Sequence, residues 1–219
     1  MQVDIRSAEA RSLHQALRAE WDVYKIILDL LRATPKLENV YHETARKAFI
    51  FCREYHRQQE FRRLCEVLRS HFSLLIKNRN RDETDIIFRG DLHLETRIQQ
   101  LIVAADLEIW RECAATAEDI YALGIHDLFA RTLRSYQEPF VKAREKLPRW
   151  LGIFYEKLTQ VFWVGENYLF YALASIRLFI HIKTFKKNIT PKQISQQADL
   201  AVLAVLAVPQ HSSRYAVFI

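Results

Sequence analysis

The sequence predicts an all-α protein, built as a right-handed α-solenoid of antiparallel helical hairpins. Its 219 residues include only 4 Gly and 5 Pro, against roughly 15 and 11 at average usage. Because turns, bulges and phosphate-binding loops depend on glycine, this composition argues against a many-stranded antiparallel sheet and against a glycine-rich nucleotide cradle. Apolar residues spaced by three or four recur along almost the whole chain, which indicates successive amphipathic helices. Since such helices cannot stand alone, we expect each to pack on its neighbours.

The expected helices follow one another with short connections. Pro35 ends the first helix because it lacks a donor and clashes with the preceding turn. Gly124 is expected just past the end of a helix, where a positive φ is useful, and Gly165 closes another. Thr190-Pro191 starts the last helix as N-cap and first residue, with Gln193 completing a capping box. In chain order the apolar stripes cover residues 13–31, 40–55, 61–75, 94–102, 107–120, 151–162, 168–179 and 193–208.

These elements predict a single helical-repeat domain over residues 1–219, with a charged insertion at 124–149. Within that insertion we expect a helix that is broken by Pro139 and again by Pro148. Residues 77–85 are polar and are expected to form a loop. The apolar stretches 168–182 and 200–208 are shorter than the ~20 residues of a membrane span. No membrane partner is therefore expected, and the N-terminal residues lack the apolar core of a signal peptide.

The sequence offers no constellation typical of catalysis or of metal binding. His42-Glu43 begins like a HExxH zinc motif, but Arg46 stands where the second histidine would be. Asp91, His93 and Glu95 alternate, and on a helix they spread around the axis. The three cysteines, Cys52, Cys65 and Cys113, lie on apolar stripes and are expected to be buried thiols of a reducing compartment. We therefore predict no enzymatic activity, no metal, no cofactor and no small-molecule substrate.

Basic residues are the more informative feature, since 32 Lys and Arg against 26 Asp and Glu give a net charge of +6. Arg46, Arg53 and Arg57 share one helical face, which fits either solvated charge paired within a helix or a binding surface. Two other basic stretches, 142–149 and 183–192, have few nearby acids, and a third at 77–81 adjoins acids at 82, 83 and 85 that would locally oppose a phosphate. All three are candidates for contact with ribosomal RNA or an acidic protein. No repeating pattern of aromatic residues alternates with them for base stacking, so any RNA contact is expected to be to phosphates. The predicted contacts are Lys77, Arg79, Arg81, Lys142, Arg144, Lys146, Arg149, Lys183, Lys186, Lys187 and Lys192.

Three stretches, Tyr41–Leu68, Leu92–Ile120 and Phe154–Pro209, resemble one protein family. Their most specific landmarks are the strings HLETR, EIW followed by AEDI, and VFW followed by GEN. In this order they resemble the largest PCI-domain subunit of eukaryotic translation initiation factor 3, the eIF3a family, over about residues 21–209. The resemblance implies the helical part of a PCI-type subunit. In that family further helical hairpins precede such a segment and a winged helix follows it, so we expect this chain to be one portion of a longer subunit.

The resemblance also implies a function. It predicts a non-catalytic, cytoplasmic scaffold that assembles with other initiation factor 3 subunits, especially the PCI subunit c. It further implies docking on the small ribosomal subunit, through protein or ribosomal RNA near the mRNA exit side. Two alternatives remain open from the residues alone. One is a PCI scaffold of another complex, the proteasome lid or the COP9 signalosome, and the other is a helical repeat that binds RNA directly.

Overall fold

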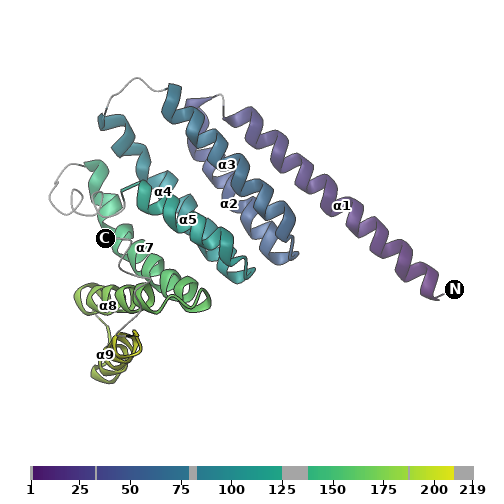
Figure 1. Ribbon diagram of the computed structural model, residues 1–219. Coiled ribbons are helices and arrows are strands. Elements are labelled where there is room, and N and C mark those ends of the chain that lie inside the picture. The colour runs from purple at the N-terminus through teal and green to yellow at the C-terminus, as the bar shows by residue number, and fades with distance from the viewer. Residues whose placement is uncertain (1, 33, 79–82, 125–137, 187, 210–219) are drawn as a thin grey trace. The chain divides into compact units, whose positions relative to one another are not determined.

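The computed structural model describes residues 2–32, 34–78, 83–124, 138–186 and 188–209, and every regular element in these ranges is helical (Figure 1). The predicted all-α helical-repeat class is confirmed. The chain forms two compact units, Met1–Leu107 and Glu108–Ile219. The expectation of one domain over residues 1–219 stays a prediction.

The first unit is organised around its second helix. Its elements are α1 (Gln2–Leu31), the 3₁₀ turn η1 (Pro35–Leu37), α2 (Glu38–Glu54), α3 (Gln58–Asn78) and α4 (Glu83–Asp106). Helix α2 packs against α1, α3 and α4, and Figure 1 shows these helices side by side. Because α2 has neighbours on three sides, most of its apolar residues are buried, whereas Val40 is exposed. The core includes Leu28, Phe49, Phe61, Leu64 and Leu101.

The second unit is a sequential stack. It contains α5 (Trp110–Ala122), α7 (Glu138–Val164), α8 (Tyr168–Phe185) and α9 (Pro191–Leu206). Each helix packs on the next, α5 on α7, α7 on α8 and α8 on α9. The largest enclosed side chains are Ile120, Leu147 and Phe154. Phe162 and Trp110, which lie on predicted apolar stripes, are only half-buried.

Most local start and stop signals act as predicted. Helix α1 ends at Leu31, before Pro35. Gly124 follows α5 with a φ of 69°. The Thr190 side chain accepts a hydrogen bond from the Gln193 backbone, and the Gln193 side chain accepts one from the Thr190 backbone, so the capping box is present.

Two boundary predictions differ from the structure. Pro148 does not break a helix, since α7 runs through it from Glu138 to Val164. The expected polar loop at 77–85 is shorter, because α3 continues to Asn78 and α4 begins at Glu83. Of the predicted insertion, residues 125–137 lie outside the described part of the chain.

The turn between α7 and α8 uses a left-handed residue, but not the glycine. Gly165 directly follows α7 as predicted, whereas the positive φ of 53° belongs to Glu166. The Asn167 backbone N–H then donates to the Phe162 carbonyl at 2.9 Å, the bond typical of a Schellman motif. His56, between α2 and α3, has a similar φ of 51°. In both turns a residue other than glycine therefore takes the positive φ.

The three cysteines form no disulfide and are buried, as predicted. Burial raises the pKa of the Cys52 thiol to about 12, which keeps it protonated and unreactive at neutral pH. Among the described helices, none combines the length and the apolar character that crossing a bilayer requires.

Candidate functional site

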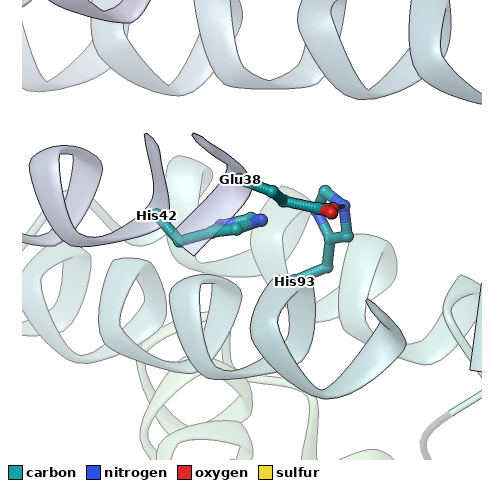
Figure 2. Close-up of side chains that lie close together, drawn as sticks. All are labelled: Glu38, His42 and His93. Atoms are coloured by element: carbon teal, nitrogen blue, oxygen red, sulfur yellow. Dashed lines mark ion pairs between the residues drawn. The ribbon is translucent and has the colours of Figure 1, made fainter. Parts of the chain in front are cut away.

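A cluster of polar side chains lies between α2 and α4 in the first unit. Glu38 and His42 are four residues apart at the start of α2, so they share one helix face. His93 comes from α4, and its Nε2 lies 3.3 Å from Oε1 of Glu38. One donor atom from each of the three residues lies within 4.8 Å of the other two. Figure 2 shows the His42 ring directed toward the other two side chains. We call Glu38, His42 and His93 the His–Glu cluster.

His42 is the most enclosed member, with 1% of its surface exposed. Its Nδ1 lies 2.9 Å from Oγ1 of Thr96, whereas its Nε2 has no hydrogen-bond partner in the part of the chain that the structure describes. Burial, helped by His93 and by the positive charges of Arg46 and Arg97, lowers the pKa of His42 to about 3. The imidazole is therefore neutral at physiological pH. If Nδ1 carries the proton and donates it to Thr96, Nε2 holds an available lone pair.

A second buried histidine lies close by. His71, on α3, has its Nδ1 3.0 Å from the Tyr41 hydroxyl and its Nε2 3.3 Å from a carboxylate oxygen of Asp29 on α1. Burial is the main cause that lowers the pKa of His71. Polar contacts thus link α1, α2 and α3 beside the His–Glu cluster. A small cavity of about 20 Å³ adjoins both sites and is lined by Tyr41, His42, Leu68, Phe72, His93, Thr96 and Arg97.

Two of the three arginines on the predicted basic face of α2 join it to α4. Arg46 reaches Glu95 at 4.0 Å, and Arg53 reaches Asp106 at 3.5 Å. Arg57 lies after the end of α2, so it does not share that helix face as predicted, and it pairs with Glu60 in the first turn of α3. The expected pairing within helices therefore gives way largely to pairing between helices. These two ion pairs connect α2 with α4.

The second unit exposes an apolar surface on its last helix. Ala201 and Ala204 of α9 are buried, whereas the large side chains on other faces of the helix are exposed. Leu203 and Leu206 are 62% and 74% exposed. A contiguous apolar surface of this kind commonly marks an interaction site. We call it the α9 apolar face, and it consists of Leu200, Val202, Leu203, Val205 and Leu206.

The structure brings some of the predicted basic residues together. Lys183 and Lys186 end α8, and Lys192 lies in the first turn of α9, so the three flank one short connection. All three are exposed and none has an ion pair within the described residues. Lys146 and Arg149 are also exposed on α7, and the Lys146 ammonium lies 5.9 Å from the centroid of the Trp150 ring.

The side chains of the other predicted basic contacts lie outside the part of the chain that the structure describes. Arg79, Arg81 and Lys187 fall outside the described residues, and the side chains of Lys77, Lys142 and Arg144 do so as well. Within the described residues, the clearest basic grouping is therefore the one at the α8–α9 connection.

Comparison with known proteins gives the family. A family model described as eIF3a, PCI domain, TPR-like region, matches residues 4–217. The chain belongs to the eIF3a family. Relatives that carry the name of the A subunit of eukaryotic translation initiation factor 3 are 38% identical over 198 residues in Nicotiana tabacum and 38% over 192 residues in Arabidopsis thaliana. A relative of the same name in Nematostella vectensis is 33% identical over 192 residues.

These alignments cover 86–89% of this chain but only 18–19% of each relative. The chain therefore spans about a fifth of the length of the eIF3a relatives it matches. Membership of the eIF3a family decides against the proteasome-lid and COP9 signalosome alternatives.

Sequence reasoning missed the His–Glu cluster. The HExxH motif requires a second histidine four residues after His42, whereas the second side chain of the cluster on this helix, Glu38, lies four residues before it. His93 comes from α4, 51 positions further along the chain. The only local signal is the Glu-x-x-x-His spacing at the start of α2, which places two metal-ligand side chains on one face.

Proposed function

We propose that this chain is a non-catalytic scaffold segment of an eIF3a-type subunit, which acts in translation initiation in the cytoplasm. Its role is positional: the helix stack presents surfaces that hold another PCI subunit, initiation factor 3 subunit c, and that dock on the small ribosomal subunit near the mRNA exit side. The family match over residues 4–217 carries this proposal. No reaction is suggested by the described side chains.

The α9 apolar face supports a protein partner. Burying a leucine that is mostly exposed contributes about 1.5–3 kcal/mol, and α9 offers Leu200, Leu203 and Leu206 on neighbouring turns. Its neighbour α8 is apolar on nearly all sides and exposes Leu169, Phe170 and Leu173 as well. A helix of that composition is typical of a position buried in an assembly. We assign subunit c to this surface.

The test is co-purification of initiation factor 3 with the intact subunit that carries Leu203→Asp and Leu206→Asp. We expect the recovery of subunit c to fall at least about tenfold, since charges placed in an interface core remove hot-spot contacts. Gln196→Glu, on an exposed position of the same helix, is the matched control and should leave recovery unchanged. Recovery of subunit c at the wild-type level would refute the assignment of α9. If the wild-type protein accompanies no initiation factor 3 subunit, the proposed function itself is wrong.

The lysines at the α8–α9 connection support the ribosome contact. Lys183, Lys186 and Lys192 are exposed and carry no ion pair within the described residues, so they are available for phosphates. Replacing all three by Ala should weaken binding to small ribosomal subunits. It should also reduce the slope of log affinity against log salt by about one for each lysine that binds a phosphate. An unchanged slope would mean that these lysines bind no phosphate and that the ribosome is contacted through protein only. Affinity for free RNA equal to that for ribosomal subunits would favour the RNA-binding alternative.

A further inference from the structure

We propose that Glu38, His42 and His93 bind a transition-metal dication of the zinc class, which joins α2 to α4. Two imidazoles and one carboxylate are the donor set of many zinc sites that keep a fourth position for water. All three residues belong to the first unit, so the site is complete within Met1–Leu107. The assignment to the eIF3a family does not rest on this site.

The spacing of the donors suits a tetrahedral ion. Zinc bonds of about 2.0–2.2 Å to nitrogen and oxygen place neighbouring ligand atoms about 3.3–3.5 Å apart. The separation of 3.3 Å between Glu38 Oε1 and His93 Nε2 already equals this tetrahedral edge. The remaining donor separations do not exceed 4.8 Å, so His42 needs to approach by at most about 1.5 Å.

The strongest support is the unpartnered nitrogen of His42. A buried polar atom without a hydrogen bond is destabilising, and Nε2 of His42 has no partner among the described residues. Its other nitrogen, Nδ1, is held by Thr96 at 2.9 Å. This is the arrangement of a metal-bound histidine, in which a hydrogen bond to one ring nitrogen orients the other toward the ion. A metal ion would use the lone pair that the protein leaves unused.

The surroundings provide access and room for a fourth ligand. The side chains of Glu38 and His93 are 14% and 13% exposed, so solvent reaches one side of the site. The adjoining cavity of about 20 Å³ is large enough for one water molecule. Hard cations such as Mg²⁺ prefer oxygen donors, whereas two imidazoles favour zinc and its neighbours.

The charged groups around the site determine the affinity that we expect for zinc. Glu38 supplies one negative charge, while Arg46 and Arg97 lie close enough to lower the pKa of His42. Glu95 pairs with Arg46, and the Arg97 guanidinium donates to Gln100 at 2.7 Å. The two guanidiniums oppose a dication, so the site should bind zinc more weakly than a closed structural site with four cysteines.

The experiment titrates the intact 219-residue chain, stripped with a chelator, with Zn²⁺ in a calorimeter. We expect one saturable site per chain and a rise in the unfolding temperature of the first unit. Co²⁺ should give the intense visible absorption of a tetrahedral complex, and Mg²⁺ should give no saturable binding.

Variants identify the ligands. Glu38→Gln and His93→Ala should each weaken Zn²⁺ binding at least about tenfold and abolish the cobalt spectrum. His42→Ala removes a core side chain and could lose the metal by unfolding the first unit. Glu38 is partly exposed, so Glu38→Gln tests the site without that effect. Glu54→Gln and His56→Asn replace an exposed glutamate and an exposed histidine near the end of α2, and should leave binding unchanged.

The proposal fails on any of three results: no saturable Zn²⁺ site in the wild type, equal affinity in Glu38→Gln, or loss of the site in the control variants. Because the readout is metal binding by the chain itself, these results are independent of whether it assembles with initiation factor 3.

Discussion

The hydrogen bond between His42 and Thr96 gives a prediction about the cost of burying polar groups. Thr96→Val keeps the shape of the side chain but leaves Nδ1 of His42 without a partner. Both residues are buried, at 1% and 4% exposure. An orphaned buried donor costs about 1–3 kcal/mol, so we expect Thr96→Val to lower the free energy of unfolding by that amount. His42→Leu substitutes an apolar side chain of similar volume, and in that background Thr96→Val should cost less than about 0.5 kcal/mol.

The assay is a double-mutant cycle in urea with a chelator present, so that no bound metal contributes. Hydrogen exchange of the α2 amides reports the first unit separately from the second. The expected coupling between the two positions is about 1–3 kcal/mol. If Thr96→Val costs the same with His42 and with Leu at position 42, the hydrogen bond contributes nothing, and the described role of Thr96 is wrong.

Three further predictions test the core, a turn and a buried histidine. Phe49→Ala should lower the free energy of unfolding by about 3–5 kcal/mol, because Phe49 is fully buried; urea unfolding measures this. Glu166→Gly should leave stability unchanged or raise it by up to about 1 kcal/mol, because Glu166 has positive φ. Glu156→Gly, inside α7, should lower stability by about 1 kcal/mol as its control. Burial lowers the pKa of His181 below the ordinary 6.5. Below about pH 6.5 the unfolded chain therefore binds more protons than the folded chain, and the free energy of unfolding should fall as the pH drops. His181→Phe should flatten that decline when urea midpoints are compared at about pH 7.5 and 5.5.

Helix limits could be predicted wherever a few adjacent residues determine them. Thr190, Pro191 and Gln193 form the capping box because the interaction needs only three neighbouring positions. Gly124 takes a positive φ for the same local reason. The assignment to the eIF3a family also rests on contiguous strings of sequence, and the family model confirms it.

Prediction failed where a local preference was outweighed by packing. Pro148 was expected to break its helix, yet α7 continues through it. Neighbouring Leu147 and Trp150 are buried, and that burial offsets the cost of about 3 kcal/mol for an interior proline. Likewise Arg46 and Arg53 pair with α4, which no pattern within α2 could reveal.

The His–Glu cluster could not be predicted because it depends on the register between two helices. A shift of α4 by one residue would rotate His93 by about 100° around its axis, away from α2. That register follows from the core contacts and from the Arg46–Glu95 and Arg53–Asp106 pairs. The HLETR string, which served as a family landmark, therefore also supplies His93 to the cluster and Thr96 as the partner of His42.

The unpaired Nε2 of His42 and the exposed leucines of α9 are two of the departures from the rule that apolar groups are buried and buried polar groups are paired. Each indicates the size of a missing partner. Nε2 of His42 is one enclosed atom beside a cavity of about 20 Å³, which has the size for an ion or a water molecule. Leu203 and Leu206 are large and open to solvent on α9, so covering them would take a surface far larger than a single ion. Departures of this kind concentrate at functional positions. The all-helical composition predicted the stack of helices, and these two exceptions within it are the places for which we propose a bound ion and a protein partner.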